Sequence, residues 1–145
     1  RYLFSSCIME NATPIKFLNF IVRESHISFK KPGDYKIDIN FEASGSVLKS
    51  TNKFILQLIA EVKDADGKFG VNIVTESYFD YDPNANIEEF KNSYFTINAP
   101  AIVFPYIRAY ISSLTALSGM PTLNLPTLNL SSIGEDLKKN IQVLD

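Results

Sequence analysis

The stretch that decides the fold spans residues 104–130 and reads F-P-Y-I-R-A-Y-I-S-S-L-T-A-L-S-G-M-P-T-L-N-L-P-T-L-N-L. Apolar side chains in its first part recur with the spacing of about 3.6 residues that is typical of a helix. Gly119 and Pro121 predict where this helix ends, because glycine suits the position after a helix and proline cannot continue one. The pentapeptide 121–125 is then repeated letter for letter as 126–130. Two such copies are too short for a solenoid, so we expect an extended chain that packs through its leucines.

The second half of the chain is predicted to be helical. A long helix is expected over residues 101–118, with Pro100 before its first turn and Pro105 inside it, where a missing N–H costs little. Residues 87–94 are predicted as a short helix and residues 135–144 as a C-terminal helix. We expect one face of the long helix to supply core or oligomer contacts. Its members are Phe104, Ile107, Ile111 and Leu114.

The first half of the chain is predicted to be a sheet. Four runs rich in β-branched and aromatic residues read as strands. They are residues 15–29, 35–43, 54–62 and 69–81. Residues 31–34 mark the first turn and residues 64–67 mark a hairpin. Because no helix intervenes, we expect a four-stranded antiparallel sheet and an α+β fold.

The pattern within the strands indicates that both faces of this sheet need a cover. The second run alternates apolar and polar residues, as in a sheet with one wet side, whereas the first run is apolar on both faces. The chain's own helices can cover one face. We therefore expect a second subunit or a ligand on the other, and an oligomer in solution.

Length and composition narrow the class of protein. The 145 residues favour a single domain, divided into an arm at 1–14 that we expect to be mobile, a sheet at 15–82 and a helical half at 87–145. The net charge of −2 without a basic block argues against nucleic-acid binding. No apolar run is long enough to span a membrane. The single cysteine, Cys7, excludes an intramolecular disulfide framework, so a cytosolic location is the simplest inference.

Catalytic and metal chemistry have weak sequence support. The segment 80–88 places oxygens at alternate positions, like a calcium loop, but has Ala85 and Lys91 where glycine and glutamate are needed. His26 is the only histidine and no G-x-S-x-G motif accompanies it. Nothing near Cys7 in the sequence lowers the pKa of a thiol. We therefore expect no enzyme, no cofactor and no metal, while an enzyme or small-ligand protein stays open as a third hypothesis.

Two motifs carry a family resemblance. F-P-Y-I-R at 104–108 and G-M-P-T-L-N-L at 119–125 resemble the signature of the SecB export chaperones, F-P-Y-A-R followed by G-T-F-P-Q-L-N-L. The spacing between the two blocks is similar as well. Ala99-Pro100 matches the residues that precede the family's long helix, and Ile27-Ser28-Phe29 resembles its L-S-F. The order of four strands and then helices covers nearly the whole chain.

The resemblance implies a particular function. Members of this family are ATP-independent holdases that keep unfolded secretory precursors soluble and pass them to the SecA motor. They assemble as homotetramers, as dimers of dimers. An aromatic-rich apolar surface suits a binder of varied unfolded chains. The candidate client-binding residues here are Phe17, Phe20, Val22, Ile55, Ile59, Tyr106 and Tyr110.

Departures from the family pattern leave the partner open. Family acids that dock the motor precede and follow L-S-F, but His26 and Lys30 hold those positions here, and Asn72 replaces a further acid. Such replacements weaken attraction to a basic partner. The family's long crossover loop also shrinks to residues 31–34. Some SecB-like proteins serve one antitoxin of a toxin–antitoxin system. A dedicated chaperone without SecA docking is therefore the alternative to a preprotein holdase.

Overall fold

The computed structural model describes residues 14–145, so Cys7 and the predicted N-terminal arm, except Pro14, lie outside the described residues. Five strands form one sheet. They are β1 (Ile15–Phe29), β2 (Ile37–Leu48), β3 (Lys53–Asp64), β4 (Phe69–Tyr81) and β5 (Ile141–Leu144). The helical elements are α2 (Ile87–Lys91), a π-helical turn (Tyr94–Asn98), α3 (Ala99–Leu117) and α4 (Ser131–Lys138). Among these described residues, no helix combines the length and apolar character needed to cross a membrane.

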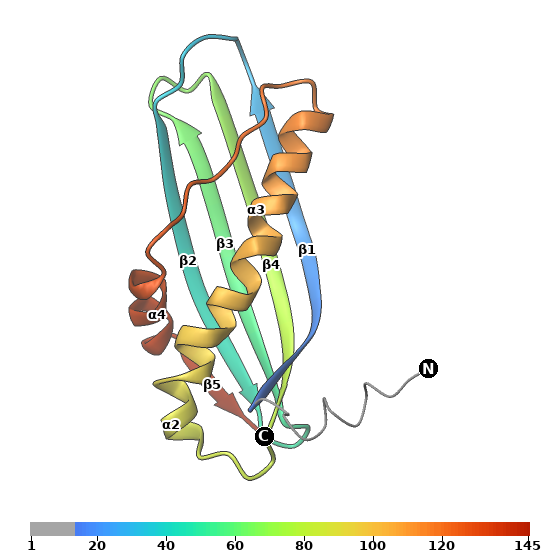
Figure 1. The fold of residues 1–145 in the computed structure, drawn as a ribbon, viewed down its shortest axis with the longest axis vertical. Helices are drawn as coiled ribbons and strands as arrows, with labels where there is room; N and C mark the ends of the chain where they lie inside the picture. The colour runs from blue at the N-terminus through green and yellow to red at the C-terminus, as the bar shows by residue number, and fades with distance from the viewer. Residues whose placement is uncertain (1–13) are drawn as a thin grey trace.

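The strand order is β1-β4-β3-β2-β5. The first four strands pair antiparallel, as the sequence predicts, whereas β5 pairs parallel to β2 over Gly45–Leu48. The predicted turn at residues 31–34 is not a hairpin turn, because β1 pairs with β4 and the chain crosses the end of the sheet to reach β2 (Figure 1). The predicted β3–β4 hairpin is present. Gly67 has a φ of 72°, which favours glycine, and its N–H donates to Asp64 O at 3.0 Å.

The molecule has two layers. α3 runs obliquely across one face of the sheet, and the chain from 118 to 130 returns beside it toward β2 (Figure 1). α4 then lies at the edge of the sheet and leads into β5. Within residues 14–145, no helix crosses the opposite face of the sheet in Figure 1. This arrangement of sheet, long helix and C-terminal helix is the α+β fold that the sequence predicts.

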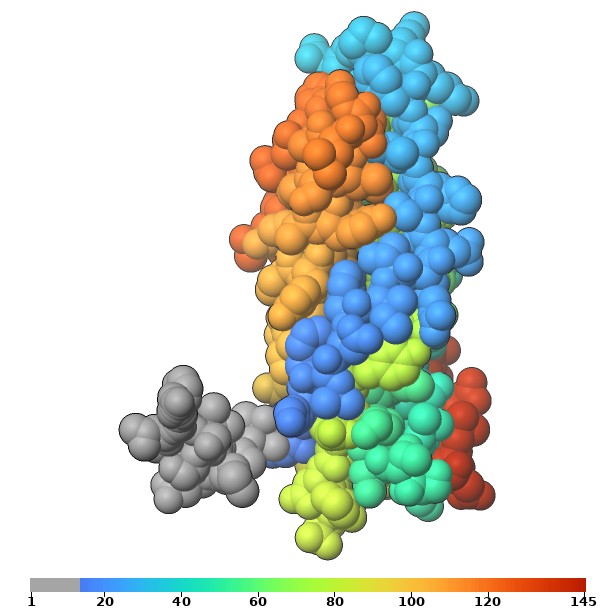
Figure 2. All heavy atoms as spheres, turned by 90° about the vertical axis from the view of Figure 1, so that its right-hand side faces the viewer, coloured from blue at the N-terminus to red at the C-terminus, as the bar shows by residue number. Residues whose placement is uncertain are grey.

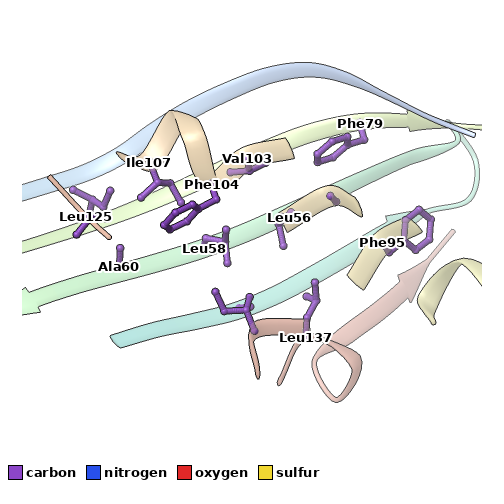
Figure 3. Close-up of a cluster of buried hydrophobic side chains, with 14 of the residues drawn as sticks. Leu56, Leu58, Ala60, Phe79, Phe95, Val103, Phe104, Ile107, Leu125 and Leu137 are labelled. Carbon is purple, nitrogen blue, oxygen red and sulfur yellow. The ribbon is translucent and has the colours of Figure 1, made fainter. Parts of the chain in front are cut away.

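The core lies between the sheet and α3 (Figure 3). Leu56, Leu58 and Ala60 of β3 point toward the helix, each at most 1% exposed. Ile107 and Ile111 of α3 are both 0% exposed, so they serve the interior of one protomer. Burial of a side chain of this size contributes about 1.5–3 kcal/mol. Of the predicted helix face, Phe104 is also buried and Leu114 is half-buried.

Three local predictions differ from the structure. Pro105 lies in the second turn of α3 rather than the first, because the helix begins at Ala99. The predicted C-terminal helix is wrong in its second half, because α4 ends at Lys138 and Ile141–Leu144 form β5. β2 also continues to Leu48, beyond its predicted end. Gly45 allows this, since a Cβ there would lie 2.8 Å from the Phe54 ring.

Candidate functional site: a groove along the open edge of the sheet

The outer edge of β2 is only partly paired. Gly45 N–H donates to Asn140 O at 3.0 Å, and Ala43 N–H donates to Asp136 Oδ2 at 3.3 Å. Alternation along a strand turns every second N–H to the same edge, so the N–H groups of Ile39 and Phe41 face outward as well. Neither has a hydrogen-bond partner among the described residues. Among the described residues, β2 therefore offers an unpaired edge from residue 37 to residue 42, upstream of the contacts that Ala43 and Gly45 make with Asp136 and Asn140.

A groove of about 750 Å³ follows this edge. β2 forms one wall, and the opposite wall consists of the second pentapeptide copy and α4. The groove also extends onto the outer face of the sheet. The lining residues are Ile39, Asn40, Phe41, Glu42, Ala43, Ser44, Gln57, Ile59, Leu128, Asn129, Ser132, Ile133, Asp136 and Asn140. Both apolar side chains and amide groups line the groove, and its two ionisable lining residues, Glu42 and Asp136, are acidic.

The F-P-Y-I-R motif holds the far wall of the groove in place. The Arg108 guanidinium lies 5.0 Å from the ring centre of Phe104, and Arg108 Nη2 donates to Pro126 O at 3.2 Å. Phe104 in turn contacts Phe41 of β2, with ring centres 5.9 Å apart. One motif therefore links α3, β2 and the start of the second pentapeptide copy.

The two pentapeptide copies make different contacts. In the first copy, Leu123 N–H donates to the buried Thr115 Oγ1 at 2.9 Å, and Leu125 is 4% exposed in the core. In the second copy, Leu128 is half-buried and lines the groove. The first copy thus anchors the segment to α3, and the second forms part of the groove wall.

α4 packs closely against the rest of the protein at the end of the groove. Leu137 is 0% exposed, and Gly134 approaches the π-helical turn so closely that a Cβ would lie 2.7 Å from Thr96 O. Asn140 Nδ2 donates to Asp136 O at 2.8 Å, just beyond the end of the helix. These contacts fix the Asp136 carboxylate against the edge of β2.

The structure separates the predicted client-binding residues into three places. Phe17 and Phe20 of β1 contact Tyr106 of α3, with ring centres 5.1 and 5.6 Å apart. Figure 2 shows β1 in blue beside α3 in orange along this side of the molecule. Val22 shares the helix-facing side of β1, because it pairs with the buried Thr75. Tyr110 is half-buried in α3 and packs against the core.

The remaining two predicted client residues lie on the outer face of the sheet. Ile55 pairs with Tyr78 and Ile59 pairs with Val74, and all four are half-buried. Only Ile59 of the predicted set lines the groove. The predicted client-binding residues thus lie on three surfaces, of which one reaches the groove through Ile59.

A charged network borders these apolar residues. Arg23 stands at a bulge in β1, and its Nε donates to Glu76 Oε1 at 2.6 Å. The hydroxyl of Tyr78 donates to the same oxygen at 2.9 Å. The hydrogen bond from Arg23 is the main cause that lowers the pKa of Glu76, against the opposing effect of burial.

The predicted partner-docking positions lie at the opposite end of the outer face. His26 and Asn72 are paired in the β1–β4 register, and a shallow depression of about 330 Å³ lies beside them. His26 is 75% exposed, with its Nε2 3.7 Å from Glu24 Oε1, which is the placement of a surface residue. Lys30 lies just past the end of β1, where its N–H donates to Lys68 O at 2.8 Å. Glu61 and Lys63 also line the depression, so its charge is mixed.

Sequence reasoning missed the edge residues Ile39 and Phe41 and the wall residues Leu128, Ile133 and Asp136. The alternation in β2 and the repeated pentapeptide were visible signals. Neither shows that β2 is near a sheet edge, because that depends on β1 crossing to pair with β4.

A two-layer α+β domain with an open-edged sheet and a groove along that edge is the class of protein that this geometry defines. Residues 11–139 match the family model described as preprotein translocase subunit SecB, and the chain belongs to the SecB family. It is 28% identical over 134 residues to the uncharacterised protein MJ0357 of Methanocaldococcus jannaschii, with 86% of this chain and 85% of that protein covered.

A solved structure has a similar fold. It is the SecB-like chaperone Rv1957 of Mycobacterium tuberculosis, in complex with a ChAD peptide from the Rv1956 HigA1 antitoxin. The TM-score is 0.69 at 18% identity, and the match covers 83% of this chain and 92% of that one. The SecB-like fold that the sequence motifs predict is thereby confirmed.

Proposed function

We propose that this protein is a holdase chaperone that works without ATP and binds non-native polypeptide as an extended segment along the open edge of β2. The observation that carries this proposal is the unpaired edge at Ile39 and Phe41 beside a groove of about 750 Å³. An extended peptide that adds to a sheet edge gains main-chain hydrogen bonds that do not depend on its sequence. Side chains on alternate sides of that peptide would meet Leu128 and Ile133 or the outer face at Ile59.

Two kinds of client fit this site. Unfolded preproteins delivered to SecA are one, as in the family at large. A dedicated client such as an antitoxin is the other, and the mixed charge around His26, Lys63 and Asn72 favours it, because an acidic docking surface for a basic motor is not present there. The solved structure of a SecB-like chaperone with an antitoxin peptide supports a peptide-binding role for this fold. A cytoplasmic homotetramer without catalytic activity completes the proposal.

An aggregation assay with a groove-blocking variant tests this function. Ser132 is exposed and lines the groove, so Ser132→Trp should fill the groove without disturbing the core. We expect the wild-type chain to suppress light scattering of a chemically unfolded client, and Ser132→Trp to need about tenfold more protein for the same effect.

The matched control places the same indole elsewhere on α4. Lys138 is exposed and does not line the groove. Lys138→Trp should protect the client as well as the wild type. Equal loss in both variants, or no suppression by the wild type at any salt concentration, would refute the proposed function.

A further inference from the structure

β5 demonstrates how the edge of β2 accepts an extended chain. It pairs parallel to β2 with Gly45 opposite Ile141 and Leu48 opposite Leu144. Backbone hydrogen bonds close both ends, from Gly45 N–H to Asn140 O at 3.0 Å and from Lys49 N–H to Leu144 O at 2.9 Å. The occupant of this part of the edge is therefore a short apolar strand from the same chain.

β5 is weakly held compared with the helix that precedes it. It has four residues, of which Val143 is 40% exposed and Leu144 is 43% exposed. Ile141 is the β5 residue that packs against the core, and it is only half-buried. By contrast, Leu137 of α4 is 0% exposed. Segments with little buried apolar surface open locally at low free energy, so β5 can detach while α4 stays in place.

The edge beneath β5 continues the edge of the groove. Gly45 has no side chain, and an ideal Cβ there would meet Ile141 Cγ1 at 3.4 Å and the Phe54 ring at 2.8 Å. Gly45 thus leaves a slot over Phe54 that Ile141 covers. Ala43 and Asn140 line the groove directly beside this slot. Release of β5 would add the slot and the edge from Gly45 to Lys49 to the open edge upstream.

We propose that β5 is an exchangeable strand, and that the edge of β2 beneath it is a cryptic continuation of the peptide-binding edge. An extended polypeptide segment with an apolar residue for the slot over Phe54 takes this edge when β5 leaves. The inference rests on the proposed function and adds to it a competition between β5 and the client. Bound client then gains the end of β2 that β5 covers, in addition to the first part of the strand.

Amide hydrogen exchange tests the opening of β5 without any client. Lys49 N–H donates to Leu144 O within β5, so it exchanges when β5 opens, whereas Gly45 N–H donates to Asn140 O, which precedes β5. We expect Lys49 N–H to exchange at least about a hundredfold faster than an N–H group of the β3–β4 ladder, such as that of Val62. Protection at Lys49 equal to that at Val62 would overturn the proposal.

A disulfide lock tests the competition. Ser46 and Gln142 are register partners, so Ser46→Cys with Gln142→Cys, in a Cys7→Ser background, should fix β5 on β2 when oxidised. The probe is fluorescein-labelled, reduced and alkylated α-lactalbumin, followed by anisotropy. We expect the oxidised form to bind the probe about tenfold more weakly than the same protein after reduction, because the locked strand withholds the part of the edge that β5 covers. A chain that ends at Asn140 should bind at least as tightly as the wild type.

The outcomes separate the two proposals. Equal affinities of the oxidised, reduced and shortened chains would overturn the exchange of β5 and leave the proposed function standing. Absence of binding by every form, the wild type included, would refute both. The reduced form of the locked variant is the matched control, because it differs from the oxidised form by one bond.

Discussion

Arg23 and Glu76 show how one side chain exploits an irregularity in a strand. The bulge between Val22 and Glu24 turns Arg23 toward the outer face, where its guanidinium meets the Glu76 carboxylate and the Tyr78 hydroxyl. Glu76 is 23% exposed and Arg23 is 52% exposed, so solvent screens this pair only partly. The network fixes the edge strand β1 on β4.

The lowered pKa of Glu76 predicts a pH dependence of stability. Because the carboxylate is favoured in the folded state, its contribution is complete above its ordinary pKa of 4.5 and is lost as pH falls through the lower folded-state value. Glu76→Gln should therefore unfold more easily than the wild type at neutral pH, and the difference should vanish in strong acid. Urea titrations at several pH values measure this.

Glu24→Gln is the control for that experiment, because Glu24 is 64% exposed on the same face. It removes an equal charge outside the network. If the difference in unfolding free energy between wild type and Glu76→Gln stayed constant down to the lowest pH, the stabilising role assigned to the Glu76 carboxylate would be contradicted.

At the scale of elements, α3 and the segment after it act as one unit. Thr115 is 0% exposed, and its hydroxyl donates to Ile111 O at 3.0 Å while it accepts Leu123 N–H at 2.9 Å. Ser112 Oγ also lies 3.1 Å from Leu123 O. The first pentapeptide copy is thus tied to the last turns of α3 at Leu123.

Thr115→Val should loosen this unit. The substitution keeps the shape but leaves the Leu123 N–H without its acceptor, which costs about 1–3 kcal/mol of unfolding free energy. Hydrogen exchange across residues 121–130 should also accelerate. Thr122→Val makes the same chemical change at an exposed position of the same segment, and it should leave both measurements unchanged. Similar losses in the two variants would show that the buried hydroxyl is not the anchor.

The sequence predicted the bounds of helices and strands better than it predicted which of these elements lie next to one another. The bounds of β1 and β4 agree with the structure, and α3 was expected within two residues of its observed ends, because periodic apolar residues and proline or glycine marks are local signals. β5 was missed, since Leu137, Ile141 and Leu144 also fit a helical spacing. Its strand conformation comes from pairing with β2, a contact with residues about a hundred positions earlier that no local pattern contains. The groove was missed for the same reason.

At the scale of the whole molecule, the side formed by β1 and α3 remains apolar. Leu18 is 41% exposed and Tyr106 is 46% exposed, beside the half-buried Phe17 and Phe20. β1 is also the edge strand opposite β5. An apolar patch next to a strand edge is the kind of surface that association covers.

Light scattering should give the mass of a tetramer for the wild type, and a smaller mass for the double variant Leu18→Lys with Tyr106→Lys. The two introduced lysines would be buried between subunits, and burying an unpaired charge costs free energy. We therefore expect the subunits of the variant to dissociate. Leu117 is 89% exposed at the end of α3, so Leu117→Lys is a control that should keep the full mass. A wild-type monomer at micromolar concentration would contradict association through this side.

The pairing of β1 with β4 has a consequence for how each copy is made. β1 leaves the ribosome first, yet its partner at Ile15 is Tyr81, so β2, β3 and β4 must all be synthesised before it has a neighbour. Asp64 favours early closure of the β3–β4 hairpin, because its carboxylate accepts the N–H of Lys68, on the other side of the turn, at 3.0 Å. Long-range pairing closes later than such local contacts. We therefore expect a nascent copy of this protein to display an unpaired apolar strand until β4 has been made, so that it is itself a chain of the kind that the finished copies are proposed to protect.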